Sequence, residues 1–147
     1  MLRTMAFLFF LTLLGCRSDQ LPIRHIEQPG YPLRARFENA QGTVRVKIYI
    51  AADGSVTFAK GSGAPDVLVQ AAEENVLQWA FGPFPRASVF PIEHTVQYAY
   101  KLEGKPQIVG YEPTVKTFLP DRIEISATPL VSDYPQIEEV KPIARRK

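Results

Sequence analysis

The single cysteine of the chain, Cys16, is the residue whose chemistry most needs an explanation. A solitary cysteine can be a nucleophile, half of an intermolecular disulfide, a buried inert thiol or an attachment point. A disulfide within the chain is excluded, because there is no second cysteine. A catalytic thiol would need a base and an electropositive pocket, and the neighbouring residues supply neither. The surroundings of Cys16 therefore favour attachment.

The residues before Cys16 are typical of an export signal. Arg3 is the only charge, and the apolar run MAFLFFLTLLG covers residues 5–15. This run is shorter than the roughly 20 apolar residues that a transmembrane helix needs. A positive start, a short apolar stretch and a small residue describe a signal peptide instead. The letters LLGC at 13–16 resemble a bacterial lipobox, in which cleavage precedes a cysteine that carries a diacylglyceryl group. We expect a signal peptide over residues 1–15 and lipid on Cys16, with an incidental cysteine behind an uncleaved stretch as the alternative.

Two further groups of residues carry titratable side chains that could do chemistry. Glu73 and Glu74 are neighbours on an expected helix, where they point about 100° apart on its polar side, as solvated charges do. His94 lies on the apolar face of an expected strand, where a hydrogen-bonded histidine is the simpler interpretation. The only other histidine, His25, precedes the expected domain, so the sequence predicts no metal site.

Sequence signatures of catalysis are absent. The loop GSGAPD at 61–66 lacks the third glycine and the Lys-Ser/Thr pair of a phosphate-binding loop. No HExxH, GxSxG or paired-carboxylate motif occurs. Catalysis would have to depend on scattered residues such as Asp53, Asp66 and His94. We expect a protein that is no enzyme and binds neither a cofactor nor a small-molecule substrate.

Length and charge limit the remaining classes. The 147 residues suit one domain with tails, since domains usually hold about 100–150 residues. Loss of Arg3 with the signal would lower the net charge from +2 to about +1, which gives no reason to expect a nucleic-acid partner.

The elements that must position any site begin with a hairpin. Residues 43–50, TVRVKIYI, alternate apolar and polar side chains, as a strand buried on one face does. Asp53-Gly54 is a strong hairpin turn signal, and the chain is expected to return through VTFAK with Val56 and Phe58 facing inward. A short helix is expected before this hairpin, between Pro32 and Gly42.

A helix and a second alternating strand follow. Asp66 is a candidate N-cap, and a stripe of apolar residues indicates a helix that packs one face on a sheet. That stripe consists of Leu68, Ala72, Val76 and Trp79. The segment 92–102 alternates again, and its inward face consists of Ile92, His94, Val96, Tyr98, Tyr100 and Leu102.

The segments outside this core differ in composition. Residues 16–28 are polar and without a sustained period, which predicts a tether. Residues 105–127 contain short alternating pieces, and Pro120-Asp121 suggests a hairpin from Thr114 to Ser126. Residues 128–147 contain three prolines and are expected to be an extended or disordered tail.

Residues 29–104 resemble the C-terminal domain of TonB, the periplasmic energy transducer. Tyr31-Pro32, the turn at Asp53-Gly54 and Ser62-Gly63 occur in that domain's order and approximate spacing. The helix resembles the family's L-x-x-A-A-x-x-x-V-x-x-W-x-F-x-P run, here Leu68, Ala71, Ala72, Val76, Trp79, Phe81 and Pro83. The resemblance implies an α+β fold, an antiparallel sheet of about three strands with helices packed on one face. In this chain the C-terminal β-hairpin extension at 105–127 would be added to it.

The resemblance also implies a mode of action. Domains of this family catalyse no reaction and bind outer-membrane transporters by pairing a short extended peptide with the exposed edge of their last strand. Carried over to this chain, the partner-binding residues would be His94, Thr95, Val96, Gln97 and Tyr98.

This chain departs from the family in its anchor and its extension. True transducers have an inner-membrane helix and a long proline-rich spacer, whereas this chain has a lipobox and a short tether. The leading hypothesis is a lipid-anchored periplasmic domain, linked to transmembrane transport, that recognises an envelope protein by strand addition. Arg17 mildly favours the outer membrane, because Asp after the cysteine would suggest inner-membrane retention in some bacteria. The alternative is a structural envelope lipoprotein whose own C-terminal hairpin closes the sheet edge.

Overall fold

The computed structural model describes residues 21–131. The predictions for residues 1–15, Cys16 and the tail beyond residue 131 lie outside the described residues. No helix between residues 21 and 131 is both long and apolar enough to cross a membrane. The elements of this part of the chain are, in order, β1 (Ile23–His25), α1 (Leu33–Phe37), β2 (Gly42–Ile50), β3 (Val56–Ser62), α2 (Asp66–Val76), β4 (Ala80–Phe81), β5 (Ile92–Leu102), β6 (Thr114–Phe118) and β7 (Arg122–Ala127).

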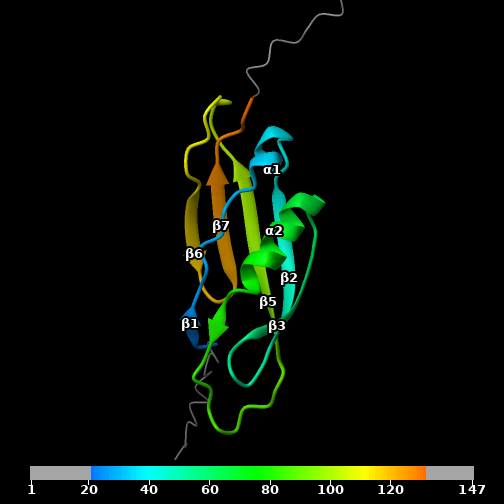
Figure 1. Cartoon of the computed structure of the whole chain (residues 1–147), viewed down its shortest axis with the longest axis vertical. Coiled ribbons are helices and arrows are strands. Elements are labelled where there is room, and N and C mark those ends of the chain that lie inside the picture. Colours follow the sequence, from blue (N-terminus) through cyan, green and yellow to red (C-terminus); the bar gives the residue numbers. More distant parts are fainter. Residues whose placement is uncertain (1–20, 132–147) are drawn as a thin grey trace, which may run out of the picture.

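Five strands form one sheet in the order β3-β2-β5-β7-β6, and both helices cover the same face of it (Figure 1). β3, β2 and β5 are antiparallel neighbours, which confirms the predicted α+β core. The predicted hairpin of β6 and β7 also forms, but it joins this same sheet, with β7 parallel to β5. A second sheet of two strands, β1 and β4, was not predicted.

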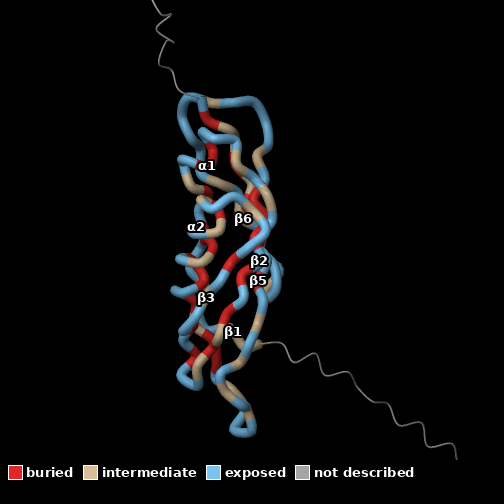
Figure 2. The backbone as a smooth tube through the Cα atoms, turned by 90° about the vertical axis from the view of Figure 1, so that its right-hand side faces the viewer, coloured by how far each residue is buried: buried red, intermediate tan, exposed pale blue. Residues whose placement is uncertain are grey.

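The core lies between the helices and the sheet, as the alternating pattern requires. The inward residues of β2, which are Val44, Val46, Ile48 and Ile50, have no exposed surface. Three members of the predicted stripe, Leu68, Ala72 and Val76, lie on α2 and have no exposed surface. The fourth, Trp79, is 2% exposed but follows the helix, which ends at Val76, earlier than the stripe predicts. In Figure 2 the buried positions run along the length of the molecule, and exposed positions gather in the loops at both ends.

The β2–β3 hairpin differs from the prediction at Phe58. The register shifts after the turn, so that Val56 lies opposite Ile50 but Phe58 lies opposite Tyr49. This irregularity turns Phe58 to the outer face of the sheet, where it is 42% exposed and stacks on the Tyr49 ring with centroids 5.1 Å apart. The expectation of an inward Phe58 is therefore wrong, whereas that of an inward Val56 is confirmed.

The described part of the expected tether is packed on the domain. β1 pairs with β4, and the Gly82 N–H donates to the Pro22 carbonyl at 2.8 Å. Further along, the buried side-chain amide of Asn75 donates to the Glu27 carbonyl at 3.0 Å. Residues 21–28 thus belong to the folded unit, because their carbonyls accept from a main-chain N–H and from a buried side-chain amide of the domain.

The start of α2 also differs in detail. Pro65 occupies the N-cap position and no side chain caps the helix, so Asp66 is the first helical residue rather than the cap. An aspartate in the first turn still interacts favourably with the helix dipole.

Tyr98 and Tyr100, which stack on each other on β5, differ in whether their hydroxyls are hydrogen-bonded. The Tyr98 hydroxyl donates to Asn75 Oδ1 at 2.9 Å, whereas the buried Tyr100 hydroxyl has no partner among the described residues. Burial raises the pKa of both phenols above the ordinary value of 10, and it raises the pKa of Tyr31 to about 12. The folded state therefore holds three tyrosines neutral at a pH where the unfolded chain ionises them.

Replacing Tyr100 by Phe is expected to make the domain less sensitive to alkali. Above pH 10 the unfolded chain loses protons that the folded chain keeps, so stability falls as pH rises, by about 1.4 kcal/mol per pH unit for each tyrosine. Tyr100→Phe should remove the contribution of one tyrosine to this fall in stability with pH. At neutral pH it should leave stability unchanged or about 1 kcal/mol higher, because it deletes an unsatisfied hydroxyl.

The matched control is Tyr98→Phe, which should cost about 1 kcal/mol at neutral pH because it removes a hydrogen bond. Urea unfolding curves at pH 7, 10 and 11 measure all three proteins. An equal loss of stability in both variants at pH 7 would contradict the assignment of the Tyr100 hydroxyl as unsatisfied.

Candidate functional site

β5 carries the five residues predicted to bind a partner. His94, Val96 and Tyr98 face the helices, and Val96 and Tyr98 have no exposed surface. Thr95 and Gln97 alternate with them and are exposed on the outer face of the sheet. Side chains of this strand therefore divide between core and surface, which leaves its main chain as the group that could recognise a peptide.

The second half of β5, residues 97–102, is already paired on both sides. β2 lies along one side, and β7 runs beside the other from Gln97 to Leu102. The Gln97 N–H donates to the Asp121 carbonyl at 2.8 Å. The expectation of a free edge is therefore corrected at Gln97 and Tyr98, because the chain's own extension occupies that position.

The first half of β5, residues 92–96, has no neighbouring strand on the side away from β2 within residues 21–131. The Gln97 N–H points toward β7, so by the alternation of a strand the main-chain groups of Thr95 and Glu93 point to the same side. The β6–β7 turn ends beside them, where His94 Nε2 lies 3.3 Å from Asp121 Oδ1 and 3.4 Å from the Pro120 carbonyl. His94 is thus the predicted half-buried, hydrogen-bonded histidine, and a short stretch from Glu93 to Val96 remains open to pairing.

An ion pair borders this stretch on the outer face. Lys47 Nζ lies 2.9 Å from Glu93 Oε1, and this carboxylate raises the pKa of Lys47. The two charges compensate each other, so the border carries little net charge. A partner would not be selected here by charge alone.

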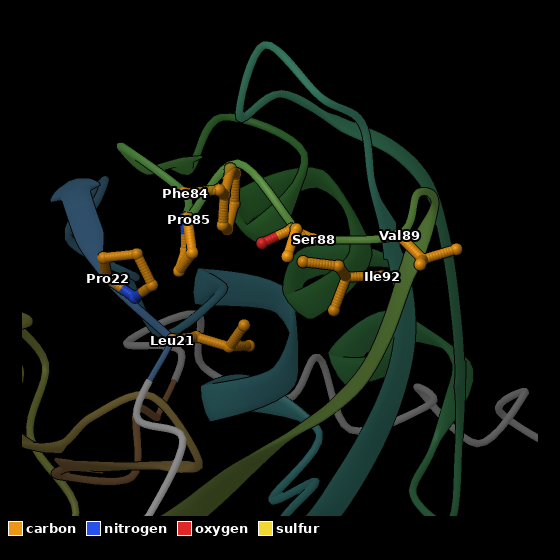
Figure 3. A pocket seen from close by; sticks show the side chains of 8 residues that line it. Leu21, Pro22, Phe84, Pro85, Ser88, Val89 and Ile92 are labelled. Carbon is orange, nitrogen blue, oxygen red and sulfur yellow. The ribbon is translucent and has the colours of Figure 1, made fainter.

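An apolar cavity of about 410 Å³ adjoins the beginning of β5. Its wall is formed by Leu21, Pro22, Phe84, Pro85, Ala87, Ser88, Val89 and Ile92. Figure 3 shows that side chains from three segments line the cavity, namely the residues just before β1, the loop after β4 and the first residue of β5. Such a hollow suits an apolar side chain, and Val89 at its rim is 84% exposed.

Two of the acidic residues considered for catalysis, Glu73 and Asp53, have structural partners. Glu73 Oε1 accepts the Gly61 N–H at 2.6 Å, which satisfies a main-chain group of the edge strand β3. Asp53 Oδ1 accepts from the Ser55 hydroxyl and N–H, and these bonds lower the pKa of Asp53. Among residues 21–131, no three His, Cys, Asp or Glu side chains are grouped as metal ligands would be.

Sequence reasoning missed Arg36, which fastens the extension to the domain. Arg36 is only 2% exposed, and its guanidinium donates to the Thr128 carbonyl at 2.8 Å, the Thr128 hydroxyl at 2.9 Å and the Tyr111 carbonyl at 3.0 Å. The Leu130 N–H in turn donates to the Arg36 carbonyl, and Leu130 is buried. The expected tail therefore begins packed at residues 128–131. An arginine in a five-residue helix gave no signal of this role.

Comparison with known proteins identifies relatives of the part that contains β5. Residues 27–102 match the family described as the Gram-negative bacterial TonB protein C-terminal. The chain is also 35% identical over 81 residues to Protein TonB of Vibrio cholerae serotype O1, an alignment that covers 52% of this chain and 33% of that protein. The chain thus spans about a third of the length of this relative. No solved structure matches the chain.

Proposed function

Because this chain belongs to the TonB C-terminal domain family, we propose that it is a periplasmic protein-binding domain that recognises an extended segment of an envelope partner by strand addition. The partner class is an outer-membrane transporter or another envelope protein that presents such a segment. In this proposal the domain serves transmembrane transport and catalyses no reaction.

The pairing of β7 with β5 carries the proposal. Six consecutive residues of β5, Gln97 to Leu102, accept a parallel strand from the same chain. The edge of β5 that faces away from β2 is thus suited to an extended segment. Main-chain N–H and C=O groups supply the affinity there, whatever the sequence of the added strand. The family match ends at residue 102, where β5 ends, so β7 lies beyond it.

The proposed contact begins at the open part of β5. The partner's main chain would pair with Thr95 and Glu93, beside His94 and Val96, and an apolar side chain of the partner would enter the 410 Å³ cavity next to Ile92. Gln97 and Tyr98 would join the contact only where the partner replaces the start of β7. The short free stretch predicts modest affinity from this strand alone.

The proposed anchor is lipid on Cys16. Signal-like residues 1–15 and the lipobox letters LLGC support it. Two or more acyl chains hold a protein on a bilayer stably where a single chain does not. Cys16 lies five positions before Leu21, so the folded part would lie within about 18 Å of the anchor, at the reach of a fully extended chain. The outer membrane is the proposed location.

A second candidate function is a structural envelope lipoprotein whose sheet edge is closed by its own hairpin. The burial of the hairpin favours it, because Ile123 and Ile125 of β7 have no exposed surface. In that case β7 occupies the docking position permanently, and the partner is held elsewhere.

A peptide titration of the soluble Cys16→Ser protein distinguishes the two functions. Extended peptides from outer-membrane transporters are expected to shift the backbone amide resonances from Glu93 to Val96. Thr95→Pro should weaken binding at least tenfold, because it removes the N–H that faces the partner while the pairing with β2 uses the alternate residues. Thr117→Pro, the same change on β6, is the matched control and should leave binding at β5 intact. Absence of any shift at millimolar peptide would contradict strand addition at β5 and favour the closed structural protein.

A further inference from the structure

β6 forms the outer edge of the five-stranded sheet (Figure 1). The Asp121 carbonyl accepts from the Gln97 N–H of β5, and the Ala127 carbonyl accepts from the N–H of Glu103, the residue after β5. The odd-numbered residues of β7 therefore direct their main chain to β5 and the even-numbered ones to β6. Because Lys116 lies opposite Glu124, the alternation turns the Lys116 main chain toward β7. Val115 and Thr117 consequently direct their N–H and C=O groups away from the sheet, where no strand of residues 21–131 pairs with them.

A hollow lies beside these two residues on the helical side of the sheet. Val115 and Thr117 form one wall, and the extended segment Ile26–Pro29 forms the other, with about 160 Å³ between them. Pro29 is buried and Ile26 is half-buried, whereas Glu27 and Gln28 at the rim are exposed. This combination suits one apolar side chain of medium size. A strand added to β6 would direct its alternate side chains to this face.

Lys116 occupies the centre of the edge on the opposite, outer face. It is exposed and forms no ion pair among the described residues, since its neighbour Glu124 pairs with Arg122 at 2.6 Å. In an antiparallel addition through Val115 and Thr117, the residue opposite Lys116 lies at a non-hydrogen-bonded position, where Cα atoms approach to about 4.5 Å. The charge of Lys116 therefore favours an acidic residue over a basic one at that position.

This geometry disfavours a second copy of the chain as the occupant. A symmetric antiparallel pairing of two β6 strands centred on this residue would place Lys116 directly opposite its own copy, and like charges at that distance repel. A carboxylate in the same place would attract. In the register centred on Lys116, the edge therefore disfavours its own copy and favours a strand with an acidic residue at that position.

We propose that the β6 edge is a second strand-acceptor site, specific for an extended protein segment with an acidic residue opposite Lys116 and apolar residues on either side of it. The acidic residue pairs with Lys116 on the outer face, and an apolar neighbour fills the hollow beside Val115. The inference rests on the proposed function in one respect, that the partner presents an extended segment. It does not require β7 to leave β5.

Two capped seven-residue peptides of alternating Thr and Val, with Glu or Lys at the central position, test the site on the Cys16→Ser protein. The Glu peptide is expected to shift the amide resonances of Val115 and Thr117. At low ionic strength it should bind about fivefold more tightly than the Lys peptide, since an attractive pair is exchanged for a repulsive one. Equal affinity of the two peptides would overturn the proposal.

Three variants locate the site. Lys116→Glu is expected to reverse the preference, so that the Lys peptide binds more tightly. Lys101→Glu is the matched control, since it makes the same charge change on the outer face of β5, two strands from the edge. It should leave the order of the peptides unchanged. Thr117→Pro should abolish binding while thermal unfolding stays the same, because its N–H faces solvent and donates to no strand.

The outcomes separate this site from the one on β5. Loss of Glu-peptide binding in Thr117→Pro but not in Thr95→Pro supports the β6 acceptor, even if transporter peptides fail to bind β5. Shifts confined to Glu93–Val96, or a reversal of preference by Lys101→Glu, would overturn it and leave the proposed function standing.

Discussion

Replacing Ile125 by Ala is expected to lower the free energy of unfolding by about 2–5 kcal/mol, the cost of a cavity in a packed core. Ile125 has no exposed surface, and it lies at the middle of β7, opposite Tyr100 of β5 and Val115 of β6. Its side chain belongs to the same cluster as the inward residues of β2 and α2. Urea or thermal unfolding of the soluble Cys16→Ser protein measures the loss.

Ile108→Ala is the matched control for this prediction. It makes the same chemical change in the same C-terminal extension, but Ile108 is 60% exposed, so the effect should stay within about 0.5 kcal/mol. A loss at Ile125 as small as that at Ile108 would contradict the packing of β7 in the core. It would then support a detachable hairpin that a partner could displace without unfolding the domain.

The burial of Ile125 means that the C-terminal hairpin of β6 and β7 is part of the folded core. A hairpin that supplies core residues and is held by the buried guanidinium of Arg36 leaves β5 only together with much of the domain's stability. Removing one partner of buried polar groups costs the full desolvation of those that remain. The open part of β5 and the β6 edge are therefore two places where an added strand would leave this hairpin and the core in place. For this reason both experiments on binding use the full chain.

The fold was predictable where one face of an element is buried and the other is solvated. The period of two in β2 and β5 and the apolar stripe of α2 each identified the residues that pack. The turn at Asp53-Gly54 was predictable because few residues accept a positive φ, and Gly54 has a φ of 91°. These signals are local, and the structure confirms them.

The departures arise where non-local contacts decide. The irregular register that exposes Phe58 depends on how β3 pairs with β2, which a single strand's sequence does not contain. β1 is only three residues long, and it becomes a strand because β4 pairs with it. Closure of the sheet edge by the C-terminal hairpin was one of two alternatives, and the parallel direction of β7 beside β5 was not predicted, since no sequence pattern states which neighbour a hairpin will pair with.

The candidate site follows the same division. Alternation placed His94 to Tyr98 on one strand, but the neighbour of that strand determined which of the five residues keep a free main chain. Arg36 and the cavity beside Ile92 were missed, because each is assembled from segments distant in sequence. Lys116 was one exposed lysine among several until the sheet order placed it at an edge.

Replacing Gly54 by Ala is expected to cost about 3 kcal/mol or more, because two independent penalties coincide there. A Cβ on Gly54 would lie 2.0 Å from the Phe81 carbonyl oxygen, which belongs to the backbone and has no flexible end to move aside. The positive φ of 91° adds strain of about 1–3 kcal/mol for a residue with a side chain. The close approach exists because the Phe81 N–H donates to the Gly54 carbonyl at 2.8 Å, so the β2–β3 turn is fixed on β4.

Gly30→Ala provides the comparison, since a Cβ at Gly30 meets nothing within 4 Å. It should change stability by no more than about 0.5 kcal/mol, and any effect through the unfolded chain would be stabilising. Chemical unfolding of both variants measures the difference. The apolar cavity borders the loop that begins just after Phe81, so Gly54→Ala should also shift the amide resonances of Phe84 and Ile92. Equal stability of the two variants would contradict the contact between turn and strand, and with it the support that β4 gives to the cavity beside β5.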